Sequence, residues 1–150
     1  MVLSNLSIVI PVYNEQARIS ASLDTILEYI SNSDFYCEIL IGDDGSQDNT
    51  VDIVNAYVEK YSNIHLFEYS HRGKGAVVKD TVMVANTEYC FICDADLSMP
   101  IEQLDRFILD LDKNDHILYG SRENVSSNRI GEPYFRYLLG RVFNFLAKLL

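Results

Sequence analysis

The chain has 150 residues and a formal net charge of −10 at neutral pH, and 48% of its residues are hydrophobic. This length and composition fit one globular domain and exclude a disordered or low-complexity chain. Nucleic-acid binding depends on Lys and Arg neutralising phosphates, so we expect no nucleic-acid partner for so acidic a chain.

The charge is unevenly distributed along the chain. Residues 129–150 hold four basic side chains and one acidic side chain, so a cationic tail follows an anionic body. We therefore predict a body over residues 1–128 and a separate segment over residues 129–150. The three cysteines are predicted to be small core residues in a reducing compartment. The start of the chain lacks a basic signal-peptide region, which predicts a cytoplasmic location.

Short β-branched runs alternate with stretches of helical periodicity. Strands are predicted over residues 6–12, 38–42, 64–69, 88–94 and 116–121, and helices over residues 19–30, 51–61, 76–85 and 104–111. This alternation predicts an α/β fold with a Rossmann-like, mostly parallel sheet flanked by helices.

Four polar clusters follow four successive predicted strands. They are Tyr13-Asn14-Glu15, Asp43-Asp44, Arg72 to Gly75, and Asp94 to Asp96. Each cluster alone could be ordinary turn chemistry. Parallel sheets bind ligands at the carboxyl ends of their strands, so the four together predict a nucleotide site. Asp44 could accept a base N–H there, the Pro11 to Tyr13 backbone could form a floor, and Lys74 could contact phosphate.

The pair Asp94 and Asp96 predicts a metal site. Alternate residues of an extended chain point the same way, so both carboxylates are expected to project together. Such a pair suits Mg²⁺ or Mn²⁺ bridging to a diphosphate. The alternative is a helix cap, with Asp96 or Ser98 capping a helix that begins at Pro100.

Five segments together resemble glycosyltransferase family 2, which has the GT-A fold. They are SIVIPVYNE at 7–15, IGDDGSQDNT at 41–50, HRGKGAVVKD at 71–80, CDADLSMP at 93–100 and GSR at 120–122. The resemblance is strongest to the dolichyl-phosphate β-glucosyltransferases, followed by the dolichyl-phosphate mannose synthases. It implies that residues 1–128 are an inverting, metal-dependent catalytic domain. The implied reaction moves glucose from UDP-glucose to a polyprenyl phosphate.

The resemblance also implies roles for single residues. The implied nucleotide-sugar ligands are Pro11, Tyr13, Glu15, Asp44, Lys74, Asp94, Ala95 and Asp96, whereas Asp43 is implied to be structural. Asp94 and Asp96 would bind the metal, but Ser98 stands where the mannose synthases have a metal-binding Gln. The implied catalytic residues are Asp96, Arg122 and Arg136, with both arginines receiving the acceptor phosphate.

Residues 134–150 have a wide apolar face beside a basic stripe at helical spacing. This pattern predicts a helix that lies in a membrane interface, at the cytoplasmic face. The alternative is an ordinary helix that covers the hydrophobic core. The segment is too short and too charged to span a bilayer. The resembled family continues beyond this point, so the chain is expected to be truncated.

Some alternatives remain open from the sequence. The transferase could use GDP-mannose and dolichyl phosphate, or build a cell-surface polysaccharide, and it could form a homo-oligomer. A sugar-nucleotide pyrophosphorylase, a phosphoacceptor receiver domain and an inactive fragment are the other candidates. The histidines, including His71, lack ligand spacing and are predicted to be surface or loop residues.

Overall fold

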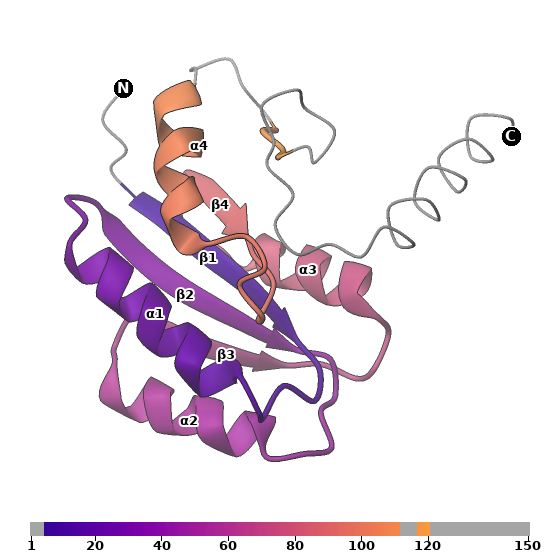
Figure 1. Ribbon diagram of the computed structural model, residues 1–150. Coiled ribbons are helices and arrows are strands. Elements are labelled where there is room, and N and C mark those ends of the chain that lie inside the picture. Colours follow the sequence, from indigo (N-terminus) through magenta and orange to yellow (C-terminus); the bar gives the residue numbers. More distant parts are fainter. Residues whose placement is uncertain (1–4, 112–116, 121–150) are drawn as a thin grey trace, which may run out of the picture. The chain divides into compact units, whose positions relative to one another are not determined.

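In the computed structural model, residues 5–111 and 117–120 are described, and four parallel strands form one sheet in the order β3-β2-β1-β4 (Figure 1). The strands are β1 (Asn5–Val12), β2 (Tyr36–Asp43), β3 (Ile64–Glu68) and β4 (Tyr89–Ile92). The helices are α1 (Ile19–Ser31), α2 (Thr50–Lys60), α3 (Lys74–Met83) and α4 (Leu104–Asp110), and a 3₁₀ turn, η1 (Ile101–Gln103), precedes α4. The prediction of a parallel α/β sheet is confirmed.

Helices cover both faces of this sheet. Figure 1 shows α1, α2 and α4 on one face and α3 on the other. The alternation of β1 explains the two layers, because Ile8 and Ile10 join the larger core with Leu23 of α1, whereas Val9 lies on the opposite side. α3 contacts β1 and β2 on that second side, and its Val77 is fully buried.

The strand register brings the carboxyl ends of the strands to one edge. β1 pairs with β2 over its whole length, from Asn5 with Tyr36 to Val12 with Asp43. The β1–β4 ladder reaches Ile92, and the Cys93 N–H continues it by donating to the Val9 carbonyl at 3.1 Å. All four loops that follow the strands therefore begin at the same edge of the sheet.

Three details differ from the sequence prediction. Residues 117–120 form no strand, since an apolar run becomes one only when a partner strand accepts its backbone hydrogen bonds. β4 ends at Ile92, two residues early, because a turn begins after it. Cys37 and Cys93 are buried as predicted, but Cys90 is exposed, because it lies on the face of β4 away from the larger core.

The predicted tail lies outside the described residues. Neither the boundary at residue 128 nor the helix over residues 134–150 is tested, and both stay predictions. Within the part of the chain that the structure describes, no helix is long and apolar enough to cross a membrane.

Gly42 on β2 allows α3 to pack closely against the sheet. A Cβ at this position would stand 2.3 Å from Thr81 Oγ1 and 2.6 Å from Val77 Cγ1. Both contacts are too short, and both neighbours are buried side chains of a packed helix.

We therefore expect Gly42→Ala to lower the free energy of unfolding by about 1–3 kcal/mol through overpacking. Gly75→Ala in α3 is the matched control, because no atom lies within 4 Å of its Cβ position. The control should match or exceed the wild-type stability in urea unfolding. Equal stability of Gly42→Ala and wild type would show that α3 can move away at no cost.

Candidate functional site

A cavity of about 370 Å³ lies at the carboxyl edge of the sheet. It is lined by Pro11, Val12, Tyr13, Glu15, Asp44, His71, Gly73, Lys74, Asp94, Ala95 and Asp96. All eight residues predicted to bind a nucleotide sugar are among them. The lining comes from the loops after all four strands, as expected for ligand sites in parallel sheets.

Two larger hollows, of about 760 and 630 Å³, border α1. Among the described residues, neither lining contains Lys, Arg or His, whereas the cavity at the strand ends contains Lys74 and His71. The described linings of the two larger hollows therefore offer no basic side chain to an anionic ligand such as a diphosphate. The smaller cavity at the strand ends is therefore the candidate site.

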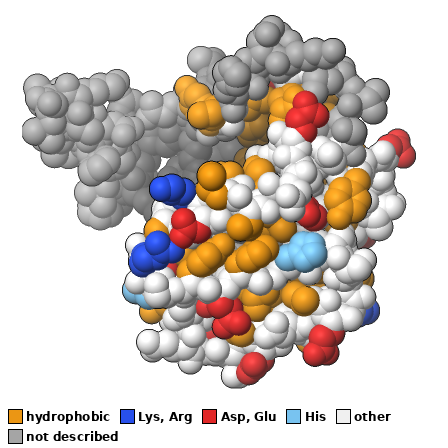
Figure 2. Space-filling model, turned by 180° about the vertical axis from the view of Figure 1, so that it is seen from behind, with side chains coloured by type: hydrophobic (Ala, Val, Ile, Leu, Met, Phe, Trp, Pro, Cys, Tyr) orange, Lys and Arg blue, Asp and Glu red, His pale blue; other side chains and the backbone are white. Residues whose placement is uncertain are grey.

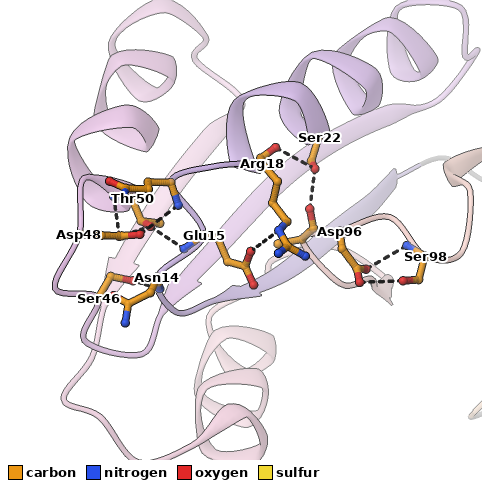
Figure 3. Close-up of polar contacts among 11 residues, drawn as sticks. Asn14, Glu15, Arg18, Ser22, Ser46, Asp48, Thr50, Asp96 and Ser98 are labelled. Carbon is orange, nitrogen blue, oxygen red and sulfur yellow. Dashed lines mark hydrogen bonds and ion pairs between the residues drawn. The ribbon is translucent and has the colours of Figure 1, made fainter. Parts of the chain in front are cut away.

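The β1–α1 loop is tied to the β2–α2 loop by side-chain-to-backbone hydrogen bonds. Asn14, whose φ is +54°, accepts from the Gln47 N–H at 2.7 Å and donates its own N–H to Ser46 Oγ at 2.9 Å. The Glu15 N–H donates to Thr50 Oγ1 at 2.8 Å, at the start of α2 (Figure 3). These bonds hold Tyr13 and Glu15 at the cavity through the backbone, without using their side chains.

Asp43 and Asp44 have different partners. Asp43, 1% exposed, accepts the N–H groups of Gly45 and Ser46 at 2.9 Å each and so shapes the turn after β2. Asp44, 4% exposed, accepts the N–H groups of Arg72 at 2.7 Å and Gly73 at 3.0 Å. The geometry thus agrees with a structural role for Asp43 and puts Asp44 at the cavity.

The segment after β4 places its two carboxylates on either side of a buried residue. Asp94 and Asp96 are exposed, whereas Ala95 between them is buried. The Ala95 carbonyl accepts a hydrogen bond from Ser22 Oγ of α1, which fixes the turn against that helix (Figure 3). The Leu97 N–H donates to the Asp94 carbonyl at 3.0 Å, and Leu97 has a φ of +47°. The pair therefore lies in a turn and not on an extended strand, so the prediction that alternation along a strand aligns the two carboxylates is wrong.

Asp96 is held by Ser98 and not by a helix. The Ser98 hydroxyl donates to Oδ2 at 2.7 Å, and the Ser98 N–H donates to Oδ1 at 2.9 Å. These two bonds, with a smaller contribution from the Arg18 guanidinium, lower the pKa of Asp96 below its usual range. η1 begins after Pro100 without a side-chain cap, so the helix-cap alternative is wrong.

Lys74 is the first residue of α3, after Gly73 with a φ of +89°. Its ammonium forms an ion pair with Asp94, and both side chains are more than half exposed, at 61% and 54%. The cavity therefore has the N-terminus of α3 and the Lys74 ammonium beside the Asp94 carboxylate. This combination suits an anion, such as a phosphate, that binds together with a metal cation.

The residues present fit a divalent cation that shares its ligands with a substrate. Within the described residues no group of three or more His, Cys, Asp or Glu side chains could hold a metal. Asp94 and Asp96 supply two carboxylates, and the Ser98 hydroxyl is already bonded to Asp96. Mg²⁺ and Mn²⁺ are commonly held by one or two carboxylates plus phosphate oxygens, which matches this set.

The sequence missed His71 as a cavity residue. Its ring stacks on Tyr13, with centroids 4.5 Å apart, and its Nδ1 lies 3.0 Å from Asp44 Oδ2. The lack of metal-ligand spacing hid it, since contacts with Tyr13 and Asp44 require the fold. Arg122 and Arg136, the two predicted acceptor arginines, lie outside the described residues.

Comparison with known proteins identifies the family. The profile of glycosyl transferase family 2 matches residues 7–146. The chain belongs to this family. Its fold is the GT-A fold that the resemblance predicted, and membership excludes the receiver-domain alternative.

The relatives of this family 2 chain include proteins named as a glucosyltransferase and a mannosyltransferase. A dolichyl-phosphate beta-glucosyltransferase from Dictyostelium discoideum is 36% identical over 143 residues, which cover 87% of this chain and 44% of the relative. The mannosyltransferase PcManGT from Pyrobaculum calidifontis, solved with GDP-Man and Mn²⁺, is 29% identical with a TM-score of 0.54, over 61% of this chain and 27% of that one. S. aureus TarS 1-349 with UDP-GlcNAc shares the fold at 23% identity and a TM-score of 0.56, over 71% of this chain and 31% of that one. The chain thus spans about half the length of the curated relatives it matches.

Replacing Ser98 should change the titration of Asp96. Because the folded pKa of Asp96 is depressed, the bonds from Ser98 stabilise the fold above about pH 4, the ordinary Asp range, and this contribution is lost as pH falls through the depressed pKa. We expect Ser98→Ala to raise the pKa of Asp96 in a carboxyl NMR titration and to lower stability more at pH 7 than in acid below the depressed pKa. Ser31→Ala, a serine bonded to the Glu28 carbonyl at the end of α1, is the control. An unchanged Asp96 titration in Ser98→Ala would contradict this account.

Proposed function

We propose that this protein transfers glucose from UDP-glucose to a polyprenyl phosphate such as dolichyl phosphate, with inversion at the anomeric carbon and with a divalent metal. The observation that carries the proposal is the single cavity that gathers Asp44, Lys74 and the Asp94/Asp96 pair from three separate loops. A nucleoside diphosphate needs a base acceptor, a cation for phosphate and a metal site. These residues are suited to those needs.

The identity of the relatives supports the choice of substrates. The Dictyostelium relative is named for glucose and dolichyl phosphate. A mannosyl donor is the second candidate, because PcManGT, 29% identical, was solved with GDP-Man. Both donors have the same charged parts, so the described cavity suits either of them.

The cavity residues suggest how the donor would be held. Asp44 would accept a base N–H with lone pairs left over from its two backbone donors. Lys74, paired here with Asp94, has an exposed ammonium that can neutralise a diphosphate at the same place. Asp94 and Asp96 would hold a Mg²⁺ or Mn²⁺ ion, which would neutralise charge developing on the departing diphosphate.

The acceptor makes few demands on the protein. A phosphate monoester is already anionic at neutral pH, since its second pKa is about 6, so its attack on the anomeric carbon needs no strong general base. Arg122 and Arg136 would orient that phosphate, because a planar guanidinium matches phosphate oxygens. Residues 134–150 would place the protein on the cytoplasmic face of a membrane, where a lipid phosphate is found.

Product analysis tests the proposal. The chain is incubated with Mn²⁺, a short polyprenyl phosphate and either UDP-glucose, GDP-mannose or UDP-GlcNAc, and lipid products are detected by mass spectrometry. We expect a glucosyl product from UDP-glucose, and NMR of that product should show the inverted, β configuration. A product from GDP-mannose alone would show that GDP-mannose, and not UDP-glucose, is the donor. Binding of UDP without any product would support the nucleotide site but contradict the proposed transfer by this chain.

Donor binding should depend on the metal carboxylates. In calorimetry with UDP and Mn²⁺, we expect Asp96→Ala to lose roughly 2 kcal/mol or more, because a charge-assisted contact and the bridging ion are both lost. Asp110→Ala, which removes an exposed carboxylate of α4 outside the cavity, is the control. Equal UDP affinity with and without Mn²⁺ would remove the metal from the proposal.

Base recognition should depend on Asp44. Asp44→Asn can keep its amide oxygen on the N–H groups of Arg72 and Gly73, but it replaces Oδ2, which also accepts from Gly73 and His71, by an amide NH₂ that can only donate. We expect UDP affinity to fall about tenfold or more while pyrophosphate affinity is kept. If Asp43→Asn is instead the damaging change and Asp44→Asn is silent, Asp43 contacts the base and our assignment of the pair is the wrong way round.

A further inference from the structure

The segment from His71 to Lys74, which leads from β3 into α3, has three basic side chains, and each contacts a different carboxylate. The pairs are Arg72 with Asp80, Lys74 with Asp94, and His71 with Asp44. Arg72 and Lys74 therefore contact carboxylates other than Asp44. Asp44, the residue proposed to read the base, receives its side-chain contact from His71.

The contact between His71 and Asp44 shows which ring nitrogen of His71 donates a hydrogen bond. Nδ1 of His71 lies 3.0 Å from Asp44 Oδ2 and 3.0 Å from the Asp44 backbone carbonyl oxygen. An ionised carboxylate and a carbonyl can only accept, so Nδ1 bears the hydrogen and donates it. Asp44 Oδ1 meanwhile accepts from the Arg72 N–H at 2.7 Å, and the Gly73 N–H is shared between Oδ1 at 3.2 Å and Oδ2 at 3.0 Å. The plane of the Asp44 carboxylate is thereby set from both sides.

The same imidazole forms part of the cavity wall. His71 and Tyr13 stack with centroids 4.5 Å apart and an angle of 30° between the rings, and both residues line the cavity. Tyr13 stays 41% exposed and the His71 side chain 60% exposed, so ring surface is left uncovered in this structure. A flat aromatic wall thus stands next to a carboxylate of defined orientation.

We propose that His71 is a positioning residue that selects the nucleobase of the donor. Its ring and Tyr13 form the wall against which the base stacks, and its Nδ1–H orients Asp44 toward the base edge. This inference rests on the proposed base-reading role of Asp44. Uracil presents a ring N–H to such a carboxylate, whereas cytosine has an unprotonated ring nitrogen at the same position, which an acceptor disfavours. The pair of residues therefore favours uridine nucleotides.

Two substitutions separate the two contacts of His71. His71→Phe keeps an aromatic ring on Tyr13 but removes the donor to Asp44, whereas His71→Asn keeps a short donor and removes the ring. The loop backbone should stay in place in both variants, because the Arg72 and Gly73 N–H groups hold it on Asp44 independently of the imidazole.

Calorimetry with UDP, CDP and pyrophosphate, each with Mn²⁺, tests the inference. We expect His71→Phe to reduce the preference for UDP over CDP by roughly tenfold, the loss of one hydrogen bond to a charged group. His71→Asn should weaken UDP and CDP alike, by roughly three- to tenfold, and keep their ratio. Neither variant should change pyrophosphate affinity. His65→Asn, the same change on β3 outside the cavity, is the control.

The outcomes separate this inference from the proposed function. A wild-type protein that binds UDP no better than CDP would overturn the base-reading role of Asp44 itself. A wild type that prefers UDP, with both His71 variants behaving like it, would overturn the inference alone. Equal losses for UDP, CDP and pyrophosphate in both variants, with a lower thermal unfolding midpoint, would show that His71 only supports the loop, and would also overturn it.

Discussion

One buried carboxylate joins the parts of the cavity. Asp44 follows β2, yet it accepts the backbone N–H groups of Arg72 and Gly73 from the loop after β3. Lys74 begins α3 directly after these two residues, so the direction of that helix and the place of its first side chain depend on Asp44. A carboxylate with several N–H donors is stable as an anion in a buried position, which explains how the charge is tolerated.

Similar bonds connect the other loops. The Asn14 side chain accepts from Gln47, Thr50 accepts from Glu15, and Ser22 donates to the Ala95 carbonyl. Each bond joins a side chain of one loop or helix to the backbone of another. The sheet aligns the strand ends, and these bonds set the loop positions more finely. Such preorganisation lowers the entropy that a ligand would have to remove on binding.

The cavity lining is acidic, with four carboxylates and one lysine, but its charged groups have partners in the described protein. Lys74 contacts Asp94, Arg18 contacts Glu15 at 2.9 Å, and Asp96 accepts hydrogen bonds from Ser98. Two of the carboxylates are therefore paired with a cation, whereas Asp96 is held by a neutral side chain. These pairs are exposed and contribute little to stability, so exchanging them for ligand contacts would cost little.

The parallel α/β fold and the position of the candidate site could be predicted from the sequence alone. Hydrophobic periodicity reports local structure, and the polar clusters after Val12, Asp43, Glu68 and Ile92 had to meet once the strands were parallel. Which side chains contact one another could be seen only in the folded chain. The contacts of His71 with Tyr13 and of Asp44 with the Arg72 amide join residues far apart in the chain, and no local pattern encodes them. The strand predicted over 116–121 was wrong for residues 117–120 for the same reason, since a strand needs a partner that periodicity does not supply.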